Sequence, residues 1–181
     1  MFISIKRKKE IKTAIFRALA SFSKEIKVSK HYTEETLRYI VIMELSKLKE
    51  YGSIPNKFKT KPQLSCQFVY KKKKSSESDE WRPDIISATF DKNGELIDPI
   101  FPVELKINSS DKDFEKCQHY VNEKVGNNVF KLLIMITVGS AWRIMLPMYK
   151  SKIKSINNGL ILWCSLEEDL NGKPKYVGKW F

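Results

Sequence analysis

Histidine and cysteine are scarce in this 181-residue chain. The two histidines are His31 and His119, and the three cysteines are Cys66, Cys117 and Cys164. The cysteines are odd in number, far apart and without CxxC spacing, so they indicate buried or free thiols in a reducing cytoplasm and no disulfide framework. Cys117 and His119 form a lone CxH, which lacks the further ligands of a zinc site.

Long apolar runs are also missing, since no segment reaches the roughly 20 residues of a membrane span. Basic residues precede an apolar stretch near the N-terminus, but Arg17 and Lys24 interrupt it, which makes it a poor secretion signal. The sequence therefore predicts no membrane partner and a cytoplasmic protein.

Acidic residues are fewer than basic ones. The chain has 21 Asp and Glu and 33 Lys and Arg, which gives a net charge of +12. The basic residues are spread along the chain as well as clustered, which favours nucleic acid over a membrane surface as the polyanionic partner. With 42% hydrophobic residues the chain is expected to fold as one domain. Its expected parts are an N-terminal basic helix (1–31), a core (32–143) and a C-terminal extension (144–181).

Two extended segments joined by an Asn-Gly turn contain the most informative residues. The segments are 82–91, which alternates in polarity, and 100–107, which is apolar except for one acid and one lysine. Positions i and i+2 of a strand share a face, so Glu104 and Lys106 point the same way. Pairing of the hairpin would bring Asp84 beside them. Two carboxylates with an adjacent cation favour a divalent metal such as Mg²⁺.

At these residues the chain resembles the PD-(D/E)XK nuclease superfamily. Pro83-Asp84 matches the first half of the motif, and Glu104-Leu105-Lys106 matches the second. The resemblance implies a restriction-endonuclease-like α/β (α+β) fold, with core order αβββαβ and a central mixed β-sheet flanked by helices. It also implies that Asp84, Glu104 and the Leu105 carbonyl hold Mg²⁺, for which Mn²⁺ is expected to substitute. Lys106 would orient water or neutralise charge on the phosphate.

Within the superfamily, the nearest pattern is the N-terminal nuclease domain of type I restriction motor subunits. There an RPDI strand, a turn and a VELK strand precede a helix ending in tyrosine, an apolar strand and a Trp-Arg hairpin. The corresponding parts here are Tyr120, the strand FKLLIMITVG and Ala141-Trp142-Arg143. The motor domains have no counterpart in this sequence.

Apolar spacing predicts two helices ahead of the sheet. The first spans about 8–27 and has a basic outer face, which fits either a solvated surface or DNA contact. The second spans about 33–51, and both Glu34 and Glu44 fall inside its apolar stripe, whereas Glu35 falls outside. Related nucleases often aim a helical glutamate at the metal, so Glu34 is the first candidate and Glu44 the alternate. The other interpretation of each is a salt bridge to a lysine.

The remaining elements are predicted to extend the sheet. Strands are expected at 62–70, 130–138 and 159–164, with a third helix at 110–125 and a hairpin within 167–181. The apolar segment 130–138 is typical of a central strand buried on both faces.

Further residues are candidates for contact with the substrate. Gln118, on the inward face of the third helix, could reach the metal water or the scissile phosphate, or could be a hydrogen-bonded core amide. A run of four lysines could follow a phosphate backbone or simply keep a loop soluble. The predicted DNA contacts are Lys71, Lys72, Lys73, Lys74 and Arg82.

The predicted function is thus a Mg²⁺-dependent DNA endonuclease. One alternative is a catalytically silent nuclease fold that binds DNA or a protein. Another is an RNA-directed nuclease, in which bases would stack on Trp81, Trp142, Trp163 or Trp180. A double-strand cut would need two active sites, and hence a homodimer, a partner subunit or two binding events.

Overall fold

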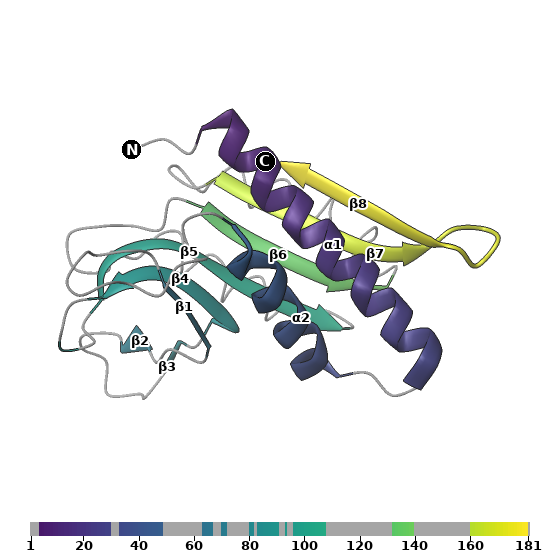
Figure 1. The fold of residues 1–181 in the computed structure, drawn as a ribbon, viewed down its shortest axis with the longest axis horizontal. Coiled ribbons are helices and arrows are strands. Elements are labelled where there is room, and N and C mark those ends of the chain that lie inside the picture. The colour runs from purple at the N-terminus through teal and green to yellow at the C-terminus, as the bar shows by residue number, and fades with distance from the viewer. Residues whose placement is uncertain are drawn as a thin grey trace.

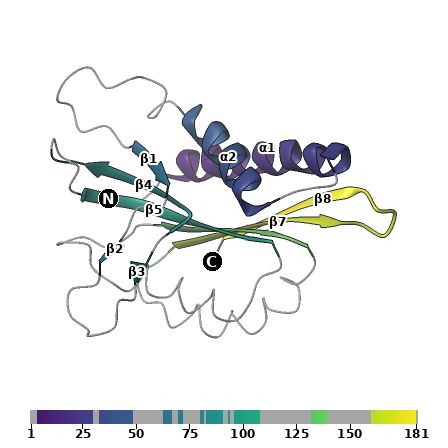
Figure 2. The same ribbon diagram turned by 90° about the horizontal axis from the view of Figure 1, so that it is seen from below.

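The fold is that of a computed structural model, which describes residues 4–29, 33–48, 63–66, 70–71, 80–81, 83–90, 93, 96–107, 132–139 and 160–180. These residues form two helices, a six-stranded sheet and a separate two-stranded ribbon (Figure 1). Both helices lie on the same face of the sheet (Figure 2). Neither of them combines the length and apolarity that crossing a membrane requires.

The helices are α1 (Ile5–Ser29) and α2 (Glu34–Ser46), and both form where apolar residues recur at helical spacing. Thr33 caps α2, because its hydroxyl accepts a hydrogen bond from the Thr36 N–H at 3.2 Å. The first-turn acids Glu34 and Glu35 suit the positive end of the helix dipole.

The prediction that the second helix runs to residue 51 is wrong, because α2 ends at Ser46. The Ser46 hydroxyl donates to the Met43 carbonyl at 2.9 Å, and the Lys47 N–H donates to the Leu45 carbonyl. These local bonds compete with the regular i to i−4 pattern and close the helix.

The six-stranded sheet has the order β1-β4-β5-β6-β7-β8. Strands β4 and β5 pair antiparallel, β5, β6 and β7 are parallel, and β8 returns antiparallel to β7. The bounds are β1 (Gln63–Cys66), β4 (Ile85–Phe90), β5 (Leu96–Ile107), β6 (Leu132–Val138), β7 (Leu160–Glu168) and β8 (Pro174–Trp180). The predicted mixed sheet with helices is confirmed. The helix expected at 110–125 lies outside the described residues, so the complete αβββαβ order stays a prediction.

The segment expected as one strand at 62–70 is divided between two sheets. Its first part forms β1, which pairs antiparallel with β4. Tyr70 instead belongs to β2 (Tyr70–Lys71), which pairs with β3 (Glu80–Trp81) in the ribbon.

The core lies between the helices and the sheet. The helix-facing positions of β5, β6 and β7 alternate with positions on the opposite face, as the period of two requires. Strand β6 is buried on both faces over nearly its whole length, which confirms that prediction. The core residues are Ile11, Ile15, Leu19 and Phe22 of α1, Leu37, Val41 and Leu45 of α2, and Val103, Leu105, Ile134, Ile136, Leu162 and Cys164 of the sheet.

The C-terminal hairpin continues the main sheet as its edge. Gly172, with φ of 69°, adopts the left-handed conformation in the turn between β7 and β8. Gly178 of β8 lies against α1, where an added Cβ would come within 2.7 Å of Lys12 Cε and Phe16 Cζ. The Lys12 ammonium also donates to the Gly178 carbonyl at 2.8 Å.

Candidate active site

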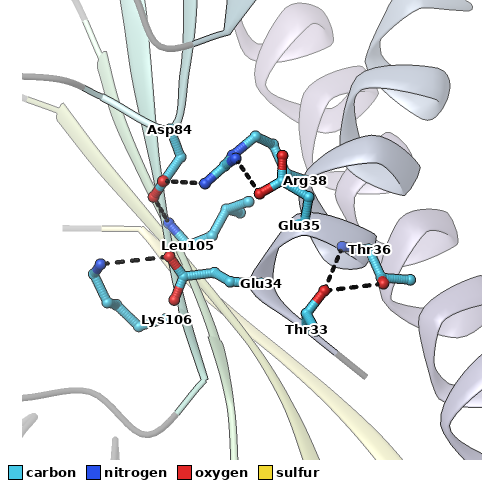
Figure 3. Close-up of polar contacts among 8 residues, drawn as sticks. All are labelled: Thr33, Glu34, Glu35, Thr36, Arg38, Asp84, Leu105 and Lys106. Carbon is cyan, nitrogen blue, oxygen red and sulfur yellow. Dashed lines mark hydrogen bonds and ion pairs between the residues drawn. The ribbon is translucent and has the colours of Figure 1, made fainter. Parts of the chain in front are cut away.

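Asp84 lies directly before β4, and two donors hold its carboxylate (Figure 3). The Leu105 N–H donates to Oδ2 at 2.8 Å, and the Arg38 Nη2 donates to Oδ1 at 2.9 Å. Only 9% of Asp84 is exposed. The bond to Leu105 places the acid of the first half-motif against the middle residue of the second.

Glu104 is more deeply buried, at 1% exposure. Strands β4 and β5 pair Ile85 with Val103, so continuing this register by one residue puts Asp84 opposite Glu104. Val103 and Leu105 belong to the helix-facing core, and Glu104 therefore occupies the opposite face of β5. The register thus places the two acidic residues side by side on neighbouring segments of the hairpin.

Lys106 and Glu34 join the end of β5 to the start of α2 (Figure 3). The Lys106 ammonium lies 3.7 Å from the Glu34 carboxylate, with 19% and 34% of the respective side chains exposed. Lys106 is one residue from the end of β5, and Glu34 is the first residue of α2. Of the two candidate glutamates, Glu34 is therefore the one that lies beside a motif residue.

Arg38 is the site residue that the sequence reasoning missed. It binds Asp84 and, through Nη1, the Glu35 carboxylate at 2.7 Å. Burial alone lowers the pKa of Arg38, but hydrogen bonding and attraction from Asp84 and Glu35 outweigh it and raise the pKa above its ordinary value. The available signal was its position four residues after Glu34, which puts both side chains on one face of α2.

Glu44, the alternate helical glutamate, has different partners. Its carboxylate pairs with Arg17 of α1 at 3.2 Å and with Lys47 one turn further along. Ten residues separate it from Glu34, which is about 15 Å along a helix axis. Both helical glutamates thus pair with a lysine, Glu44 with Lys47 and Glu34 with Lys106, and only the second of these lysines belongs to the motif.

The structure describes only some of the other candidate residues. Trp163 is a core residue, with 3% exposure and an indole N–H that donates to the Thr137 hydroxyl at 3.0 Å, so it is not available for stacking on bases. Trp180 is partly buried, with the Lys8 ammonium 5.6 Å from its ring. The backbone of Lys71 is described, but its side chain is not. Outside the described residues lie Lys72, Lys73, Lys74, Arg82, Gln118 and Trp142.

The donors at the site fit a divalent cation in chemical type. No group of three or more His, Cys, Asp or Glu is placed to hold a metal among the residues that the structure describes. Asp84 and Glu104 nevertheless supply two hard carboxylates, and Mg²⁺ commonly takes one or two from a protein and completes its shell with water and substrate phosphate. The N–H and C=O of a strand residue point to the same side, so the Leu105 carbonyl also lies on the Asp84 side.

Comparison with known proteins assigns no family to this arrangement. No family model matches the chain, and no curated protein or solved structure matches it.

Proposed function

We propose that this protein is a Mg²⁺-dependent deoxyribonuclease that hydrolyses phosphodiester bonds at Asp84, Glu104 and Lys106. The observation that carries the proposal is the 2.8 Å hydrogen bond from the Leu105 N–H to Asp84. The PD and ELK half-motifs lie 21 positions apart in the chain, and this bond brings them into direct contact. Their contact at the end of a hairpin, with a second buried carboxylate opposite, supports a shared site.

In this proposal Asp84, Glu104 and the Leu105 carbonyl would hold the cation. When bound, Mg²⁺ supplies Lewis acidity, which polarises the phosphate and makes water a stronger nucleophile. The burial of both acids limits the water that would otherwise screen these charges.

Lys106 would act on the substrate directly. Its ammonium is a compact charge on a flexible stem, which suits it to neutralise the charge that builds on the phosphate or to orient the attacking water. Glu34, 3.7 Å away, would keep the ammonium at the mouth of the site in the absence of DNA. Glu34 is thereby a positioning residue for Lys106.

The test is cleavage of supercoiled plasmid with Mg²⁺, Mn²⁺ or EDTA by the wild type and by Lys106→Ala. We expect nicking or linearisation that requires the cation, and a fall of roughly 10²-fold or more in the variant, the size typical of losing one transition-state charge contact. DNA binding should be largely retained. Lys175→Ala, an exposed lysine on β8, is the matched control and should cut at the wild-type rate.

A folded protein that binds DNA in a salt-sensitive manner but never cuts would instead identify a silent binding module. One observation favours this second candidate, because Arg38 supplies Asp84 with a positive partner from within the protein. Competition among duplex DNA, single-stranded DNA and RNA would decide the substrate, since an RNA-directed nuclease should prefer the last.

A further inference from the structure

Arg38 forms a guanidinium contact that the proposed mechanism does not use. Its side chain is 11% exposed, and its two ion-pair partners are both acids, the sheltered Asp84 and the exposed Glu35. Glu35 is 75% exposed, so that bond is a weak surface contact, whereas the bond to Asp84 is sheltered. The guanidinium therefore links an exposed acid on α2 to the proposed cation-binding acid.

The edge of the guanidinium that faces Asp84 is only half used. Nε and Nη2 lie on the same edge and together form the fork that grips two oxygens of a carboxylate or phosphate. Nη2 donates to Asp84 Oδ1, but Asp84 Oδ2 is already taken by the Leu105 N–H. Nε is buried and has no hydrogen-bond partner within the described part of the chain. A buried donor without an acceptor is unfavourable, and an incoming oxyanion with two free oxygens would satisfy both donors.

A bound divalent cation would change this arrangement. Asp84 would then face two cations, and the monovalent guanidinium would be repelled from its position against Oδ1. The bond to Glu35 gives Arg38 a pivot at the rim, so that the Nε and Nη2 edge could turn outward while Nη1 keeps its contact.

We propose that Arg38 exchanges partners at this site: it holds Asp84 when no metal is bound, releases Asp84 to a divalent cation, and then grips a phosphate oxygen pair of the DNA through Nε and Nη2. This inference rests on the proposed nuclease function. It assigns Arg38 a phosphate-binding role and makes it a competitor of the metal. Because of these two roles, replacing Arg38 should strengthen metal binding and slow DNA cleavage.

The experiment compares wild type, Arg38→Gln, Arg38→Lys and Asp84→Asn in Mn²⁺ binding by calorimetry, without DNA, and in plasmid cleavage at saturating Mn²⁺. Arg38→Gln removes the charge but keeps a donor for Asp84, so it should bind Mn²⁺ about tenfold more tightly. It should also gain more thermal stability from Mn²⁺ than wild type does, since tighter ligands stabilise more. Its cleavage rate should fall at least tenfold.

Arg38→Lys tests the shape of the guanidinium separately from its positive charge. Lysine keeps the positive charge but lacks the fork, so Mn²⁺ affinity should stay near that of wild type while cleavage falls. If Arg38→Gln does not fold by circular dichroism, Arg38→Lys still decides the matter, because cleavage at the wild-type rate would overturn the phosphate-binding role.

Mn²⁺ binding to Arg38→Gln that is equal to or weaker than that of wild type would overturn the exchange and leave the proposed function standing. A different result marks failure of the proposed function itself: Mn²⁺ binding that is absent from wild type, or unchanged in Asp84→Asn, would remove the cation from this site and the inference with it.

Discussion

Replacing Asp84 should weaken the fold as well as abolish cleavage, because its carboxylate joins three elements. In Asp84→Ala the Leu105 N–H loses its acceptor and Arg38 loses its sheltered counter-charge. Hydrogen bonds to charged groups contribute about 1.5–3 kcal/mol each, and leaving one member of a buried ion pair alone costs about 3–5 kcal/mol. Both side chains of the pair are 11% exposed, so water offsets part of this. We expect a loss of roughly 2–4 kcal/mol in the free energy of unfolding.

The assay is urea unfolding in EDTA at pH 7.5, with the midpoints compared at a common slope. Asp84→Asn should lose less than Asp84→Ala, since its amide oxygen can still accept from the Leu105 N–H. The double variant Asp84→Asn with Arg38→Gln should show a coupling energy of about 1 kcal/mol or more, because the two residues share one contact. Glu168→Ala, at an exposed end of β7, is the matched control and should change stability by less than about 0.5 kcal/mol.

A value for Asp84→Ala within about 0.5 kcal/mol of wild type would refute this reasoning. It would mean that the two hydrogen bonds of Asp84 are no stronger than those that the same groups make with water. The hairpin would then be held at this end by its backbone ladder and apolar packing, with no net contribution from Asp84.

Three further predictions concern other parts of the molecule. Glu44→Gln should leave plasmid cleavage unchanged and cost less than about 1 kcal/mol, because its cationic partners are largely exposed; a large loss of cleavage would restore Glu44 as the helical site residue. Gly178→Ala should lower stability by about 1–3 kcal/mol in thermal melts through overpacking against α1, and an unchanged melting temperature would contradict the close approach. Burial raises the pKa of the Cys164 thiol to about 12 from its ordinary 9.0, although Lys12 lowers it. The folded state thus holds this proton more tightly than the unfolded chain, so stability should fall as pH rises from about 9 towards 12, and iodoacetamide should label a variant with only this cysteine slowly below that window.

The local elements near the site could be predicted from the sequence because each depends on neighbouring residues. Alternation and an Asn-Gly turn indicated the hairpin of β4 and β5, and the apolar run indicated β6. The end of α2 was missed because the competing bonds of Ser46 and Lys47 are weak local effects that apolar spacing does not register.

The partners of the charged residues could not be predicted, because they come from distant positions. Glu34 and Glu44 both fall inside the apolar stripe of their helix, and only the packing of α1 against α2 places Arg17 beside Glu44. Arg38 meets Asp84 across 46 positions, and no spacing rule covers that distance. The roles of Asp84, Glu104 and Lys106 in catalysis stay predictions.

The contact between α1 and β8 also bears on how the chain acquires its structure during synthesis. Lys12 and Gly178 touch across 166 positions, and α1 packs on β7 and β8, which leave the ribosome long after it. Until then, α1 can pack on α2 but not on the sheet, and loop closure over such a separation is slow. The final assembly of the domain should therefore wait for the synthesis of β7 and β8, and α1 is the element that stays incompletely covered in the meantime.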